Sequence, residues 1–149
     1  DPKRAGELLL AEAASPEERA QAYSSTISMW AHNDPNGAGE WLASQEQGAE
    51  LNQARQQFAN TIAQRDPDSA MAWANAVTDA NGRENAVQSV YLQWAGKDQE
   101  AAAAALGKSD LSAEKIAEIK ALEVPKATAS DTFPAQLVPA AAIEIQQAE

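Results

Sequence analysis

The stretch that decides the fold is Ile62-Ala63-Gln64-Arg65-Asp66-Pro67-Asp68-Ser69-Ala70-Met71-Ala72-Trp73-Ala74. It aligns with residues 30–42 at an offset of 32 residues, and with residues 94–106 at the same offset. A fixed period of roughly 20 to 50 residues is typical of helical repeats that stack on their neighbours. A fourth, partial copy opens the chain at residues 1–8, at an offset of 33. The sequence therefore predicts an all-α fold, a short α-solenoid with a 32-residue period.

Each repeat is predicted to form two antiparallel helices that meet at the Asp-Pro turn. The longer helix carries an apolar stripe at every fourth residue, and the aspartate caps the shorter helix while proline takes its first position. The predicted caps are Asp34, Asp66 and Asp98. The shorter helix then places a small residue beside a large one, so that neighbouring helices approach closely. The predicted core positions are Trp30, Trp41, Phe58, Ile62, Trp73, Val90, Trp94 and Leu106.

The repeats divide the chain into a helical part over 1–123 and a tail. We expect a partial repeat over 1–14, repeats over about 15–46, 47–78 and 79–110, and a capping helix over 111–123. Ser15-Pro16-Glu17-Glu18 predicts a sharp helix start as a capping box. Gly48 and Gly82 are expected to close shorter helices in the left-handed conformation. A chain that begins in mid-repeat predicts further repeats upstream or a neighbouring chain on that face.

The tail over 124–149 has a different composition, with Pro125, Pro134 and Pro139 among Ala, Thr, Ser and Val. Prolines at this spacing exclude a continuous helix and favour an extended arm. We expect its large apolar side chains to dock either on this chain's own helices or on a partner. These side chains are Phe133, Leu137, Val138, Ile143 and Ile145.

Residues 66–73 carry a resemblance to a known family. An aspartate-proline turn followed by alanine and an aromatic residue resembles the junction between tetratricopeptide repeats, over roughly residues 1–108. The chain lacks the family's Leu-Gly pair and later tyrosine, and its period is 32 rather than 34 residues. The Trp-Ala-x-x-Asp-Pro form is also similar to repeat proteins of environmental bacteria. The tetratricopeptide resemblance implies paired helices, and the similarity to the bacterial repeat proteins implies no activity.

Composition narrows the possible partners. The formal net charge of -11 repels nucleic acid and anionic lipid headgroups, and no apolar stretch approaches the length of a membrane span. With no cysteine, disulfides and thiolate metal sites are excluded. We therefore expect protein partners, without nucleic acid and without membrane insertion. Acidity and abundant Ala, Asn and Gln suit a bacterial periplasm or exterior, but they also suit a cytoplasmic scaffold.

Residues that could carry chemistry are few, and each has a structural interpretation. His32, the single histidine, lies where it would cap a helix end. The acidic pairs Glu17/Glu18 and Asp66/Asp68 could support a hydrolase, although a carboxylate that recurs in every repeat is better explained as a cap. The segment 79–85 lacks the pattern of a calcium-binding loop. We expect no enzyme activity, no cofactor and no metal.

The sequence therefore predicts a protein-binding scaffold or accessory subunit. The alternative is a structural subunit that assembles into rings or filaments through its open repeat end and its tail. Tyr23 and Tyr91 lie outside the shared apolar stripe and are predicted to be exposed contacts. Polar positions predicted to face a partner on the concave side are Gln21, Gln53, Arg55 and Asn85.

Overall fold

The computed structural model describes residues 1–122, and residues 123–149 lie outside the described part. Within residues 1–122 the chain is entirely helical, which confirms the predicted all-α class. It forms eight α-helices, a short 3-10 turn η1 and no strand in that range. The elements are α1 (Pro2–Glu12), α2 (Pro16–Trp30), α3 (Pro35–Ala43), η1 (Ala49–Leu51), α4 (Asn52–Ile62), α5 (Pro67–Asn75), α6 (Ala80–Ala95), α7 (Gln99–Gly107) and α8 (Ala113–Lys120).

Side-chain caps start most of the described helices. The Asp34 carboxylate accepts from the Gly37 N–H at 2.9 Å to start α3, and Asp98 caps α7 in the same way at 3.0 Å. At α2 the Ser15 hydroxyl accepts from the Glu18 N–H at 3.1 Å, while the Glu18 carboxylate accepts from the Ala14 N–H. These bonds satisfy backbone N–H groups that have no partner inside the helix, and they fix where each helix begins.

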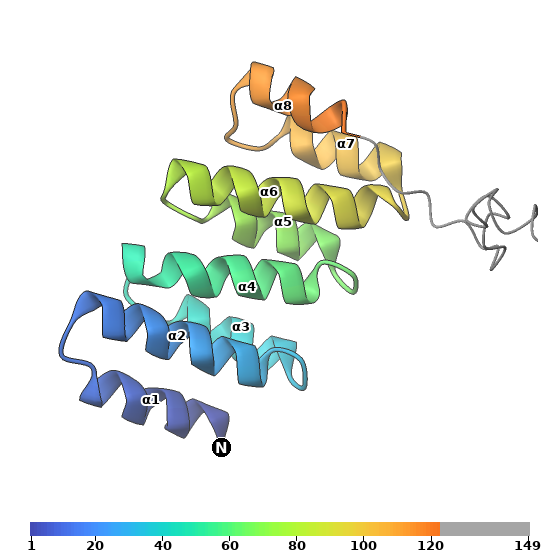
Figure 1. Ribbon diagram of the computed structural model, residues 1–149. Helices are drawn as coiled ribbons and strands as arrows, with labels where there is room; N and C mark the ends of the chain where they lie inside the picture. The colour runs from blue at the N-terminus through green and yellow to red at the C-terminus, as the bar shows by residue number, and fades with distance from the viewer. Residues whose placement is uncertain (123–149) are drawn as a thin grey trace, which may run out of the picture.

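Consecutive helices pack against one another along the chain. Figure 1 shows α2, α4 and α6 side by side in one row, with α3, α5 and α7 behind them, and α1 and α8 at opposite ends. The tightest packing joins α4 to α5, α1 to α2 and α2 to α4. One continuous apolar core runs through these contacts from Ile27 in α2 to Ile119 in α8. No helix of the described part combines the length and the apolar character that crossing a membrane requires.

The shorter helices end differently from the prediction for Gly48 and Gly82. None of the described glycines has a positive φ; Gly48 is extended, and Gly82 lies in the first turn of α6. Polar side chains cap the free carbonyls instead. At the end of α3 the Ser44 hydroxyl and the Gln45 amide both donate to the Trp41 carbonyl, at 2.6 and 2.9 Å. With these carbonyls satisfied, the turn needs no left-handed glycine.

Candidate binding hollows on the shorter helices

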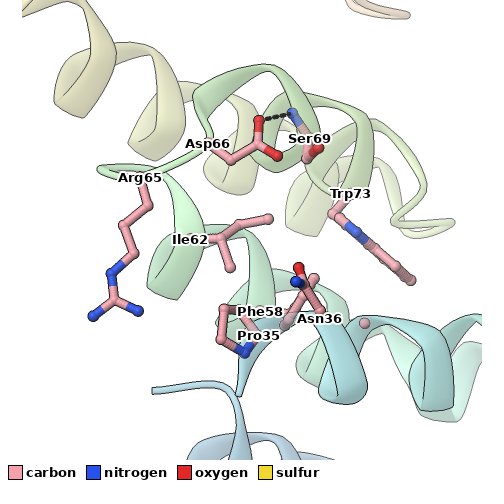
Figure 2. Close-up of a pocket in the computed structure, with 9 residues that line it drawn as sticks. Pro35, Asn36, Phe58, Ile62, Arg65, Asp66, Ser69 and Trp73 are labelled. Atoms are coloured by element: carbon pink, nitrogen blue, oxygen red, sulfur yellow. Dashed lines mark hydrogen bonds between the residues drawn. The ribbon is translucent and has the colours of Figure 1, made fainter. Parts of the chain in front are cut away.

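A hollow of about 300 Å³ opens between α3, α4 and α5. We call it the middle hollow, and Figure 2 shows its side chains. Its floor and one wall are apolar, and its remaining lining is polar. The lining residues are Pro35, Asn36, Gly39, Phe58, Ile62, Arg65, Asp66, Ser69 and Trp73.

The floor of the middle hollow is an aromatic pair. The buried ring of Phe58 meets the half-buried ring of Trp73 edge-on, with centroids 5.2 Å apart and planes at 81°. This geometry is favourable for two aromatic rings beyond the area that they bury. Gly39 makes room for the pair, because a Cβ at that position would lie only 2.9 Å from Phe58 Cζ. Since Trp73 keeps part of its surface free, an entering apolar group can contact it.

The polar residues of the middle hollow are already engaged in structural contacts. Asp66 Oδ1 accepts from the Ser69 N–H at 3.1 Å as the cap of α5, a bond drawn in Figure 2. Hydrogen bonding from Ser69 holds the pKa of the Asp66 carboxyl below its usual value. The Arg65 guanidinium donates to the His32 carbonyl at 3.5 Å, so that it links α4 to the turn after α2. Asp66 is therefore a charged cap and is poorly suited to act as a general base at neutral pH.

Two further hollows flank the middle one. The first hollow, about 340 Å³, lies between α1 and α3 and is lined by Lys3, Trp30, Gly37, Glu40, Trp41 and Ser44. The third hollow, about 410 Å³, lies between α5 and α7 and is lined by Asp68, Met71, Ala72, Asn75, Trp94, Ala101, Ala104, Ala105 and Lys108. Each of the three hollows lies between two helices, which are α1 and α3, α3 and α5, or α5 and α7. Each also borders the last turn of the longer helix that stands between those two in the sequence, which is α2, α4 or α6. Each contains one basic and one acidic side chain, so that its lining has no net formal charge.

A separate polar cluster surrounds Tyr23 at the other end of α2. Arg19 Nη2 lies 3.1 Å from Glu50 Oε1, and a hollow of about 320 Å³ opens beside them. Burial, with the nearby Glu50 carboxylate as a second cause, raises the pKa of the Tyr23 hydroxyl. The Tyr23 ring packs on Trp41, with centroids 5.9 Å apart. Tyr23, which we predicted to be exposed, is thus half-buried.

Tyr91 is not an exposed contact: its side chain is only 1% exposed. The prediction assumed that α6 buries a single stripe. Packing against α4, α5 and α7 instead buries two adjacent stripes of this helix. The buried residues of α6 are Gly82, Ala86, Val87, Val90, Tyr91, Trp94 and Ala95.

Arg55 also differs from its prediction as a residue facing a partner, because it is only 2% exposed. Its guanidinium donates to the Ala76 carbonyl at 3.2 Å and to the Gln47 side chain, and so ties α4 to the end of α5. Burial lowers the pKa of Arg55. The other three polar positions are exposed, namely Gln21, Gln53 and Asn85.

The remaining predicted residues are buried, half-buried, exposed or outside the described range. Buried are Trp41, Phe58, Ile62, Val90, Trp94 and Leu106, whereas Trp30 and Trp73 are half-buried. The tail residues Phe133, Leu137, Val138, Ile143 and Ile145 lie outside the described residues. His32 is exposed, and Asp79 caps α6 by accepting from the Gly82 N–H at 2.6 Å. Among residues 1–122, no three His, Cys, Asp or Glu side chains are grouped to hold a metal ion.

The sequence pattern does not reveal the hollows themselves. A small residue lines each of them, namely Gly37, Ser69 and Ala101, and the sequence pattern assigns such residues to close helix packing. Comparison with family models, with curated proteins and with solved structures found no match to this chain.

Proposed function

We propose that the chain is a tetratricopeptide-like α-solenoid of antiparallel helix pairs, and that it is a non-catalytic scaffold or accessory subunit of a larger complex. In this proposal it holds an extended segment of a partner protein in the row of hollows. The main support for this function is that corresponding lining residues of the three hollows lie 32 residues apart in the sequence. Trp30, Ile62 and Trp94 form one such set, Gly37, Ser69 and Ala101 a second, and Trp41, Trp73 and Ala105 a third.

Recurring contacts support a repeat of 32 residues. Asp34, Asp66 and Asp98 adopt similar backbone angles, with φ of -141°, -140° and -146°. The contact of Arg65 with the His32 carbonyl corresponds to that of Lys97 with the Gln64 carbonyl, at 2.8 Å. Repeats that contact mainly their neighbours are expected to reuse contacts in this way.

Hydrogen bonds between the longer helices follow the same offset. Ser28 donates to Gln57 at 3.1 Å, and the corresponding positions pair as Ser89 and Asn60 at 2.7 Å. The direction of donation is reversed, but the two positions are the same in each repeat. These two bonds indicate the same register between α2 and α4 as between α4 and α6.

The chemistry of the hollows favours binding over catalysis. Carboxylates at the repeat junctions are engaged as helix caps. The apolar floors, with one acidic and one basic side chain at each hollow, suit the side chains of an uncharged peptide. Interfaces on repeat surfaces gain affinity from many modest contacts rather than from one deep pocket.

Peptides selected from a random display library against the full chain test this function. Ser69→Trp places a large ring in the middle hollow, while the backbone N–H that Asp66 caps remains. Gln53→Trp adds the same ring at an exposed position of α4 outside the hollows. We expect Ser69→Trp to weaken the selected peptides at least about tenfold, or about 1.4 kcal/mol, and Gln53→Trp to leave the affinity unchanged. Equal affinities for both variants would refute the proposal.

A self-assembling structural subunit is the second candidate, favoured by an exposed apolar face on α1. Leu8 is 58% exposed and Leu9 is 40% exposed. Such a face that meets a different surface of the next copy would build rings or filaments. Light scattering on the full chain and on the double variant Leu8→Gln/Leu9→Gln distinguishes the two functions. If the chain assembles through α1, the variant should have a smaller native mass than the unchanged chain.

A further inference from the structure

The charged side chains of the hollows restrict which kind of segment can bind there. Each contains one acidic and one basic side chain, although the whole chain has a net charge of -11. A strongly charged segment would leave one of these side chains facing a like charge. The fitting occupant is an uncharged segment with large apolar side chains a few residues apart.

The chain itself contains such a segment after its last described helix. Residues 132–143 carry no charged side chain and include Phe133 and Leu137. Pro134 and Pro139 disfavour a helix there and favour an extended backbone, which is the form that a row of shallow hollows can bind.

We propose that the hollows bind this chain's own segment 133–143, with Phe133 in the third hollow and Leu137 in the middle one. This rests on the proposed function, since it names an occupant for the same surface.

The length of chain between the last helix and the segment agrees with this placement. Ten residues, 123–132, separate Leu122 from Phe133, and an extended backbone of that length reaches about 33 Å. The described part of the chain ends just after α8, which packs on α7, and α7 lines the third hollow through Ala101.

The spacing within the segment also agrees. Phe133 and Leu137 are about 13 Å apart in an extended chain, which is slightly more than the roughly 8–10 Å between packed helices. Two such side chains can therefore enter neighbouring hollows on either side of α5.

Engineered cysteines test the placement in the full chain, which has no cysteine of its own. One variant combines Asn36→Cys, at the rim of the middle hollow, with Gln136→Cys, next to Leu137. The control combines Gln53→Cys with Gln136→Cys, because Gln53 is also exposed but lies outside the hollows. A disulfide requires Cα atoms within about 7 Å. We expect the first pair to form an intramolecular disulfide at least about tenfold faster than the control, because docking raises its effective concentration.

Adding Phe133→Asp and Leu137→Asp to the first pair should slow it to the rate of the control. Equal rates for the two pairs would overturn the proposal. A disulfide found only between two molecules would also overturn it and would identify the segment of a second copy as the occupant. Binding of the library peptides distinguishes a failure of this placement from a failure of the proposed function. If they still depend on Ser69, the hollows bind segments and only the assignment of this chain's own segment is wrong.

Discussion

Removing the Asp66 carboxylate should destabilise the chain by a small and defined amount. Its Oδ1 accepts from the Ser69 N–H at 3.1 Å and caps α5, the helix that packs most closely on α4. Replacing an aspartate cap by alanine costs about 1 kcal/mol of unfolding free energy. For a domain of this size that corresponds to about 4 °C in Tm. Asp66→Ala should show this loss in urea and thermal unfolding followed by far-ultraviolet circular dichroism.

Asp68→Ala is the matched control for this variant. It removes the same charge two residues further along the chain, in the first turn of α5, where the side chain makes no hydrogen bond within residues 1–122. Its effect should stay within about 0.5 kcal/mol. If the two variants lose equal stability, the effect comes from charge near the helix start rather than from the cap, and the reasoning is refuted.

The effect of Asp66→Ala should also depend on pH in one direction. The pKa of Asp66 is lowered in the folded chain, whereas an unfolded aspartate titrates near 3.9. The stabilisation is therefore fully present above about pH 4 to 5 and is lost as the pH falls through the lower, folded pKa. The stability difference between wild type and variant should be constant near neutral pH and should shrink only under acid conditions. A difference that grew on acidification would contradict the assigned pKa direction.

Two further predictions concern Arg55 and the helix glycines. Arg55→Ala should lower the unfolding free energy by about 2 kcal/mol or more, because it leaves a cavity at a side chain that is only 2% exposed and removes the donor to the part-buried Ala76 carbonyl. Arg55→Met also removes the donor but keeps most of the volume, so it should cost less, and equal urea midpoints for the two would contradict this. Gly39→Ala should destabilise, since its Cβ would lie 2.9 Å from Phe58. Gly107→Ala should stabilise by up to about 1 kcal/mol, because nothing lies within 4 Å of its Cβ; thermal unfolding of both variants should show opposite signs.

The sequence predicts local features of this chain better than its long-range packing. The all-helical class follows from composition and periodicity, and the structure confirms it within residues 1–122. The caps at Asp34, Asp66 and Asp98 depend on contacts three residues apart, and the structure places each aspartate at the predicted position. Short-range patterns of this kind are decided by a few neighbouring residues, so a single sequence is enough to predict them.

Burial of individual side chains depends on neighbours that the sequence pattern does not specify. Tyr91 lies off the apolar stripe that the sequence predicts, yet three helices pack around α6 and cover it. Arg55 has a charged side chain but takes its partners from the end of α5, 21 residues away. Only the packed structure shows these partners.

The hollows illustrate a different limit, because small residues line all three of them. Gly37, Ser69 and Ala101 stand 32 residues apart in the sequence, and each lines one of the three hollows together with Trp41, Trp73 or Ala105. The same small residues would also allow helices to pack closely, and the sequence does not distinguish these two outcomes. Only the helix spacing in the folded chain shows that space is left.

The central claim is that the row of hollows binds an extended segment of protein. The most direct test is to map amide chemical-shift changes on the isotope-labelled full chain as a library-selected peptide is added. We expect the largest changes at Asn36, Ser69 and Ala101, and small ones at Gln53 and Asn85 on the exposed surface of the longer helices. Changes confined to Gln53, Asn85 and their neighbours would contradict the claim and would place the binding surface on the longer helices.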